Sequence, residues 1–240
     1  MIPKVIYYVW LGKAPLPNQV QENIQSRKKF NPDFKIIRID EQNYDINKIN
    51  FVKEAYMEGK WAFASDAVRL DVIYHYGGFY LDTDVTLIDS LEKFRKNNSV
   101  WALETVNNIN TGLILGANSN DPTVGDVLDI YRKMHFCKAK IPNLITTGIV
   151  SDYFIKRGLK PINKLQVLDK NIYIYPSEYF APYHWWGGGR ITEKTVAIQN
   201  YNKSWGNSSD VNFRRLMRLN LRHYFPQLFY FIQKIRKARK

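Results

Sequence analysis

Apolar and polar positions along the chain follow two different periods, which predict alternating strands and helices. Residues 5–10 are apolar or aromatic throughout, as in a buried strand. Residues 17–29 then have helical spacing, with Val20, Ile24 and Arg27 on one stripe, and residues 34–39 have the pattern of a second strand. A strand, a helix and a strand in this order are typical of an α/β sheet.

The same alternation continues through the rest of the chain. Residues 61–76 have a helical composition and end at a Gly-Gly pair, which stops a helix. Residues 79–85 then have the pattern of a short strand. Further strands are predicted at 100–103, 113–115, 166–168, 172–175 and 195–199, and further helices at 123–136 and 150–157.

Length and composition fit one compact domain. The chain has 240 residues, of which 45% are hydrophobic and 15% aromatic, so it can bury a sizeable core. The single cysteine, Cys137, cannot form an internal disulfide, which favours a reducing cytoplasm. We expect neither a signal peptide nor a membrane-spanning helix, because the required apolar runs are missing.

The formal net charge of +13 is concentrated near the C-terminus. Residues 210–240 contain nine Lys/Arg and one acidic residue, a net charge of +8. We therefore expect two regions, a folded domain at 1–208 and a basic amphipathic tail at 209–240 that docks on an anionic membrane surface. A nucleic-acid partner is not expected, because no nucleic-acid-binding module accompanies the charge. The apolar positions of the predicted tail helix are Phe213, Leu216, Met217 and Leu221.

Two aspartates, Asp82 and Asp84, lie near the C-terminal end of the predicted strand at 79–85. A strand would place both carboxylates on one face, with α-carbons roughly 6.5–7 Å apart. Close carboxylates repel each other unless they surround a cation or face water, and oxygen ligands suit Mg²⁺ or Mn²⁺. The alternative is a solvated strand end that carries two acids by chance. Ligands of open α/β sheets gather at such strand ends, which favours a site.

Asp66 and Arg69 lie three residues apart, on one face of the helix predicted at 61–76. They form either a local ion pair, worth about 0.3–0.5 kcal/mol, or a pair that binds substrate hydroxyls. The residues alone leave both interpretations open.

Several motifs in a fixed order resemble a known family. They are IPKVIYYVW at 2–10, SD-x-x-R at 65–69, GGFYLDTD at 77–84, NTG at 110–112, TG at 147–148, YP-x-EYF at 175–180 and SW at 204–205. Together they resemble the DXD-containing sugar transferases of glycosyltransferase family 32, which are common in bacterial capsule and surface-polysaccharide synthesis. The pattern is also similar to the glucosylating domains of large bacterial toxins.

The resemblance implies an A-type glycosyltransferase fold, that is, a single α/β Rossmann-like domain in which helices flank a mixed sheet. It further implies retaining transfer of a hexose from UDP-hexose, such as UDP-galactose or UDP-glucose, with a GDP-sugar as the second choice. The acceptor would be a glycan or lipid-linked saccharide. Together with the basic tail, this predicts a cytoplasmic enzyme that is peripheral at the inner face of the membrane.

The resemblance also assigns residues to roles. Trp10 would stack on the base, and Asp82 would contact the ribose or the sugar. The catalytic candidates are Asp66, Arg69, Asp82 and Asp84. The candidates that bind the nucleotide-sugar are Trp10, Asp66, Arg69, Tyr80, Asp82, Asn110, Ser204 and Trp205. The candidate ligands of Mn²⁺ or Mg²⁺ are Asp84, Asp82 and Asn200.

Two departures from the family pattern leave other functions open. Tyr7 stands where bacterial members often carry His, and Gln199-Asn200 stands where they often carry His-His. A non-catalytic sugar-binding homologue is therefore one alternative. Residues 82–86 also match the D-x-D-x-T motif of haloacid-dehalogenase-type phosphatases, in which the first Asp is the nucleophile. That nucleophile normally follows the first strand of its domain, whereas two strands are predicted to precede Asp82.

Overall fold

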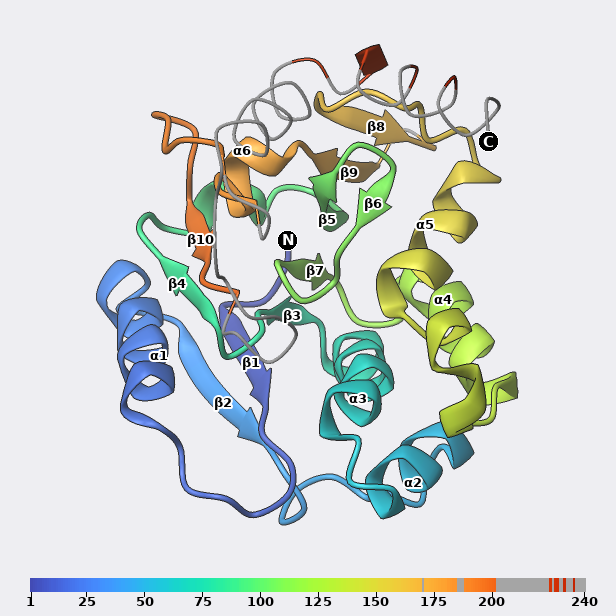
Figure 1. Cartoon of the computed structure of the whole chain (residues 1–240). Helices are drawn as coiled ribbons and strands as arrows, with labels where there is room; N and C mark the ends of the chain where they lie inside the picture. The colour runs from blue at the N-terminus through green and yellow to red at the C-terminus, as the bar shows by residue number, and fades with distance from the viewer. Residues whose placement is uncertain are drawn as a thin grey trace, which may run out of the picture.

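A mixed β-sheet forms the centre of the computed structural model, which describes residues 1–169, 171–184, 188–201 and positions 225, 227, 228, 231 and 235 (Figure 1). Within these residues the strand order is β2-β1-β3-β7-β5-β9-β8, with β6 paired to β5. A second, two-stranded sheet pairs β4 with β10. The strands of the large sheet are β1 (Val5–Val9), β2 (Lys35–Ile39), β3 (Gly78–Tyr80), β5 (Ser99–Thr105), β6 (Asn108–Ile109), β7 (Leu115–Ala117), β8 (Gln166–Leu168) and β9 (Ile172–Tyr175). Those of the small sheet are β4 (Val85–Leu87) and β10 (Ala197–Gln199).

Helices cover both faces of the large sheet. Figure 1 shows α2, α3, α4 and α5 grouped together, away from α1, which lies beside β4. The sheet separates two hydrophobic clusters, because neighbouring residues of one strand, such as Phe79 and Tyr80, contribute to different clusters. The helices are α1 (Asn18–Phe30), α2 (Asn50–Met57), α3 (Trp61–Tyr76), α4 (Pro122–Lys133), α5 (Thr146–Ile155) and α6 (Ser177–Phe180), with 3₁₀ turns at Glu92–Phe94 and Lys138–Asn143.

The carboxyl ends of three parallel strands meet at one edge of the sheet. β1 pairs in parallel with both β2 and β3, so the segments after these strands lie close together. Gly77 and Gly78 allow this arrangement, since both have positive φ and a Cβ on Gly78 would lie 2.9 Å from the carbonyl oxygen of Val5. Ligands of open α/β sheets bind at this kind of edge.

The structure confirms most of the predicted elements and corrects one. The helices at 17–29 and 61–76 are present as α1 and α3. The continuous strand predicted at 79–85 is wrong: β3 ends at Tyr80, and the chain turns before β4 begins at Val85. The main-chain N–H of Val85 donates to the carbonyl of Asp82 at 3.1 Å, closing the turn. The pairing of the two carboxylates therefore depends on a turn and not on strand alternation.

The C-terminal tail lies largely outside the described residues. At the five described positions between 225 and 235, Phe225, Leu228, Phe231 and Ile235 are exposed. The division at 208/209 accordingly stays a prediction. Among the described helices, none combines the length and apolar composition needed to cross a membrane.

Candidate functional site

The turn that follows β3 carries Asp82 and Asp84 to the edge where β1, β2 and β3 end. The main-chain N–H of Asp82 donates to the carbonyl of Gly112 at 2.8 Å, which fixes the start of the turn. The Asp82 carboxylate accepts a hydrogen bond from the Tyr80 hydroxyl at 2.8 Å and lies 3.2 Å from Nη2 of Arg69. Asp82 is therefore held on one side by a phenol and a guanidinium.

Arg69 is the central cation of this site. Its side chain is 4% exposed, and its Nη2 lies 2.8 Å from Oδ1 of Asp66, so it bridges Asp66 and Asp82. Its Nη1 donates to Oγ1 of Thr111 at 3.3 Å, and its guanidinium lies 4.8 Å from the centre of the Tyr80 ring. The i,i+3 ion pair considered from the sequence is thus present, but it is buried and extends to the aspartate turn. These contacts bring together four predicted site residues, namely Asp66, Arg69, Tyr80 and Asp82.

Burial changes the pKa of the Asp66 carboxyl group. It raises the pKa of the Asp66 carboxyl to about 6, with a further increase from the charge of Asp82, although Arg69 and a hydrogen bond with Thr146 act in the opposite direction. A largely buried carboxylate accepts hydrogen bonds strongly when it is ionised. Asp66 therefore suits contact with a ligand hydroxyl.

Asp84 lies opposite the end of β10. Its Oδ2 accepts a hydrogen bond from Nε2 of Gln199 at 2.9 Å. This contact forms because β10 pairs antiparallel with β4 and places Gln199 across from Val85. Burial raises the pKa of Asp84 to about 6, and the charge of Asp82 adds to the increase, whereas the Gln199 hydrogen bond lowers it. Two carboxylates that repel each other in this way gain from a nearby cation.

The chemistry of the donor set near Asp84 fits a hard divalent cation. Oε1 of Gln199 is buried and has no hydrogen-bond partner among the described residues. Carboxylate and amide oxygens are the ligands that Mg²⁺ and Mn²⁺ prefer. No cluster of three or more His, Cys, Asp or Glu side chains occurs in the described part of the chain, so carboxylates alone do not form a complete ligand set there.

Asn200 contacts the aspartate turn through its nitrogen atoms. Its Nδ2 donates to the carbonyl of Asp84 at 2.9 Å and to Oγ1 of Thr86 at 2.8 Å, and its main-chain N–H also reaches the Asp84 carbonyl. The contact with the Asp84 carboxylate itself comes from the neighbouring Gln199, which is not among the predicted site residues. Metal ligation by Asn200 stays a prediction.

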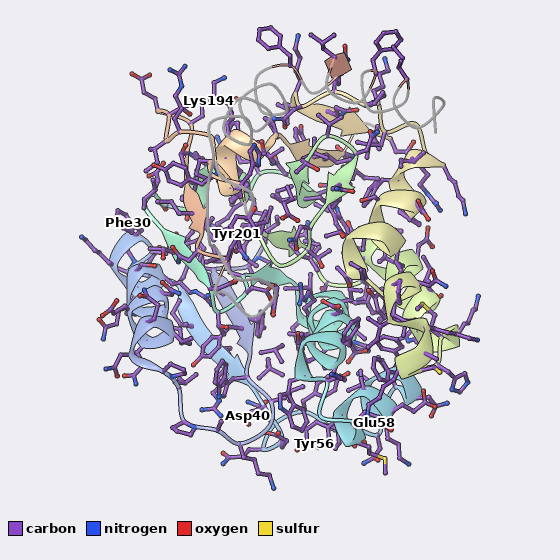
Figure 2. The ribbon with its side chains drawn as sticks, in the orientation of Figure 1. Phe30, Asp40, Tyr56, Glu58, Lys194 and Tyr201 are labelled. Atoms are coloured by element: carbon purple, nitrogen blue, oxygen red, sulfur yellow. The ribbon has the colours of Figure 1, made fainter. Side chains whose placement is uncertain are left out.

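Trp10 follows β1 and bonds to the last residue of β2 through its main chain. Its main-chain N–H donates to the carbonyl of Ile39, and its indole Nε1 donates to the carbonyl of Ala14 at 2.7 Å. A cavity of about 470 Å³, to whose lining Trp10 does not contribute, is lined by charged and polar side chains, among them Asp40, which is labelled in Figure 2. The full lining is Lys13, Arg38, Asp40, Glu41 and Gln42. This cavity lies at the sheet edge that carries the aspartate turn.

Asn110 is held at both ends of its side chain. Its Nδ2 donates to Glu104 at 3.1 Å, and its Oδ1 accepts the N–H of Gly112 at 2.8 Å. Burial raises the pKa of the Tyr201 hydroxyl, and the nearby Glu104 carboxylate raises that pKa further; Tyr201 is labelled in Figure 2. Ser204 and Trp205 lie outside the described residues, so their predicted roles stay predictions.

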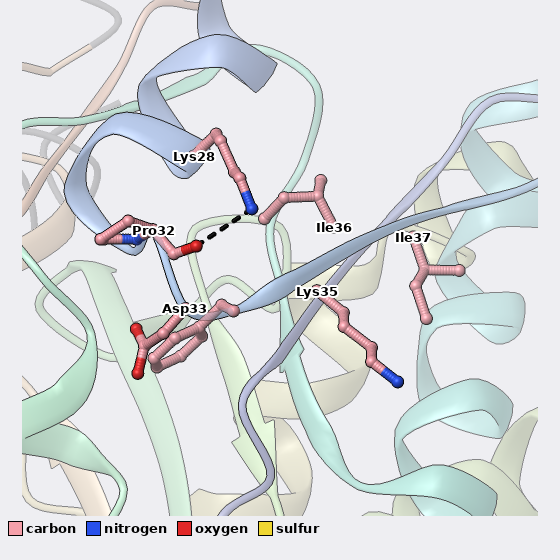
Figure 3. A pocket seen from close by; sticks show the side chains of 7 residues that line it. Lys28, Pro32, Asp33, Lys35, Ile36 and Ile37 are labelled. Atoms are coloured by element: carbon pink, nitrogen blue, oxygen red, sulfur yellow. Dashed lines mark hydrogen bonds between the residues drawn. The ribbon is translucent and has the colours of Figure 1, made fainter.

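A separate cavity of about 570 Å³ lies along the outer strand β2. Figure 3 shows the side chains that line it, from Lys28 to Ile37. None of the predicted site residues contributes to this lining. The candidate site is therefore the aspartate turn and its neighbours, and not this cavity.

The chain is similar to glycosyltransferases in two comparisons. A family model described as "Glycosyltransferase sugar-binding region containing DXD motif" matches residues 17–101, a segment that contains α1, α3 and the aspartate turn. A solved structure, "PaToxG Glycosyltransferase", is 17% identical with a TM-score of 0.52, and the match covers 65% of this chain and 69% of that one. This likeness shows an α/β fold of the A-type glycosyltransferase kind, with helices flanking a mixed sheet.

Two further solved structures are more distant. The UDP-bound glycosyltransferase domain from the YGT toxin is 12% identical with a TM-score of 0.40, and the match covers 67% of this chain and 68% of that one. A glycosyltransferase involved in the glycosylation of the major capsid of PBCV-1 is 9% identical with a TM-score of 0.44, covering 74% and 84%. No curated protein matches the chain.

Proposed function

We propose that this chain is a DXD-containing glycosyltransferase, which transfers a hexose from a UDP-sugar with the help of Mn²⁺ or Mg²⁺. The family model that matches residues 17–101 supports this proposal. UDP-glucose and UDP-galactose are the favoured donors, and a GDP-sugar is the second choice. The observation that carries the proposal is the cluster of the largely buried Asp66 and Arg69 with the partly exposed Asp82, next to Asp84, at the carboxyl ends of β1 and β3.

The metal would be held by Asp84, with Asp82 and the amides of Gln199 and Asn200 nearby. A divalent cation at such a position stabilises the negative charge that develops on a leaving diphosphate. The residues of the chain prepare that position: Gln199 orients the Asp84 carboxylate by its hydrogen bond. Arg69 and Tyr80 keep Asp82 in place from the other side.

The donor sugar would lie beside Asp66. Its largely buried carboxylate can accept a hydrogen bond from a sugar hydroxyl, while Arg69 keeps the carboxylate oriented from a distance of 2.8 Å. Since Arg69 also holds Asp82, its removal would disturb the aspartate turn as well as the sugar. Trp10 would pack on the base of the nucleotide, with the neighbouring charged cavity taking the polar groups of the nucleoside.

The first test is a panel of nucleotide-sugars with Mn²⁺, read as slow donor hydrolysis and as a shift in the melting temperature. At 100 times its dissociation constant, a bound donor should stabilise the protein by about 2.7 kcal/mol. We expect a UDP-hexose to give the largest shift and the fastest turnover. Stabilisation without turnover would point to the sugar-binding alternative, and hydrolysis of free sugar phosphates would point to the phosphatase.

We also propose that the acceptor is a glycan or lipid-linked saccharide and that the enzyme works at the inner face of the cell membrane, as in surface-polysaccharide synthesis. The support is the net charge of +8 at residues 210–240 and the exposed side chains of Leu228, Phe231 and Ile235. Flotation with liposomes should show binding that requires anionic lipid, weakens with salt and disappears on truncation at Ser209. Equal recovery of the full-length and truncated chains would refute it.

A further inference from the structure

The three carbonyl oxygens of the Asp82-Thr83-Asp84 turn each accept a hydrogen bond from a side chain of another element. Nη2 of Arg27 donates to the carbonyl of Asp82 at 2.6 Å. Nδ2 of Asn23 donates to the carbonyl of Thr83 at 2.9 Å, and Asn200 donates to the carbonyl of Asp84. The main chain of the turn is thus fixed residue by residue.

Two of the three donors lie on one face of α1. Asn23 and Arg27 are four residues apart, so they are neighbours on the helix surface, and both are at most 1% exposed. The Oδ1 of Asn23 also accepts from Oγ1 of Thr86, which extends the contact into β4. A buried helix face would ordinarily carry apolar side chains, as Val20 does on the same helix.

Arg27 is costly to bury for stability alone. Its side chain is fully buried, and Nε and Nη1 have no hydrogen-bond partner among the described residues. Burial lowers its pKa to about 10, with opposing contributions from Tyr80 and Asp82, so it is charged at neutral pH. A buried cation with unpaired donors stabilises a fold poorly compared with an apolar side chain of similar size.

We propose that Arg27 is a positioning residue for the aspartate turn, acting with Asn23 through the main chain of residues 82 and 83. It holds the carbonyl of Asp82 from behind, so the carboxylates of Asp82 and Asp84 start from fixed backbone positions. The role depends on the proposed function, because it is the donor and its metal that the carboxylates are positioned for. Arg27 itself touches neither.

The test compares Arg27→Met and Arg27→Lys in the full chain, with UDP-glucose and UDP-galactose as donors and Mn²⁺ as the metal. Methionine removes the hydrogen bond and the charge, yet the Asp82 carbonyl keeps its bond from Val85, so we expect little loss in melting temperature. Donor turnover should fall about 10- to 100-fold, as expected for a small displacement of a catalytic group. Lysine, which keeps the charge and a donor, should recover most of the turnover.

Arg95→Met is the matched control. Nε of Arg95 donates to the carbonyl of Ile2 at 2.8 Å, so it also holds a main-chain carbonyl, but in the segment that precedes β1 and away from the aspartate turn. This variant should lose melting temperature while kcat and KM stay near wild type. If Arg27→Met keeps wild-type turnover, or if its turnover and melting temperature fall together with no recovery in Arg27→Lys, Arg27 has no positioning role.

If Arg27→Met does not fold, Asn23→Ala tests whether the side chains of α1 position the aspartate turn. It removes the hydrogen bond to the Thr83 carbonyl and leaves the arginine in place. A loss of turnover larger than that of Arg95→Met supports the inference, and unchanged turnover overturns it. Failure of the proposed function would show earlier, as a wild-type protein that turns over no nucleotide-sugar, and the inference would fall with it.

Discussion

Asp84→Asn should abolish metal-dependent donor turnover, with a loss of about 100-fold or more, while the folded protein becomes no less stable. The expected loss follows from the several kcal/mol that a catalytic cation contributes and from the tenfold change in rate for each 1.36 kcal/mol. Asparagine keeps the size of Asp84 and can still bond to Gln199, which donates to Oδ2 in the wild type. Turnover is measured with a UDP-hexose in a Mn²⁺ titration.

The stability of the same variant depends on pH in a defined direction. Burial and the charge of Asp82 raise the folded-state pKa of Asp84 from 3.8 to about 6. The wild type therefore carries an unfavourable carboxylate above about pH 6, at a cost that the unfolded chain does not have. In EDTA at pH 7.5, Asp84→Asn should melt at or above the wild-type temperature. The difference should shrink as the pH falls through 6 and vanish near 4.

An exposed aspartate provides the control for Asp84. Asp89 lies after β4, pairs with Lys93 at 2.8 Å and has a side chain that is 50% exposed. Asp89→Asn should change neither turnover nor the Mn²⁺ requirement. If Asp84→Asn kept its turnover, or if it lost turnover and melting temperature together in EDTA, Asp84 would be a structural residue and not a metal ligand.

Periodicity predicted the fold well because most elements have clear boundaries in the sequence. The helix at 61–76 ends at Gly77 and is present as α3 with the same bounds. The helix α2 at residues 50–57 was missed, since it is only two turns long and its N-cap position, Ile49, offers no capping side chain, although Gly59 follows its end. The strand at 79–85 was extended too far, because Leu81 and Val85 are both buried and alternate correctly around a turn that only tertiary contacts reveal.

Motifs predicted the acidic part of the site together with Arg69 and Tyr80, but missed Gln199, Arg27 and Asn23, which also hold the aspartate turn. Asp66, Arg69 and Asp82 stand in contact, as the ordered motifs suggested. Gln199 could not be placed, because its contact with Asp84 depends on the pairing of β10 with β4, 115 residues apart in sequence. Arg27, a cation on the predicted apolar stripe of α1, could have indicated a buried polar contact. Periodicity does not predict, however, that this contact is with the carbonyl of Asp82.

Gly112→Ala should reduce donor turnover by about 100-fold through loss of space beside Asp82. A Cβ on Gly112 would lie 1.9 Å from Oδ2 of Asp82, 2.7 Å from its Cγ and 3.1 Å from Nη1 of Arg69. Such contacts cannot be accommodated unless the carboxylate moves. Since Arg69 and Tyr80 both bond to Oδ1 of Asp82, its movement would break two buried contacts at once.

Gly125→Ala separates this effect from ordinary overpacking. Gly125 lies in α4, and a Cβ there would lie 2.9 Å from the ring of Tyr74, which belongs to the distal part of α3. Both glycine variants should lose about 1 to 3 kcal/mol of stability, the usual cost of an added methyl group in a packed region. Only Gly112→Ala should also lose turnover at a temperature where both proteins are folded. Equal turnover in the two variants would mean that the position of the Asp82 carboxylate does not limit the reaction, and the assignment of Asp82 to the catalytic site would be wrong.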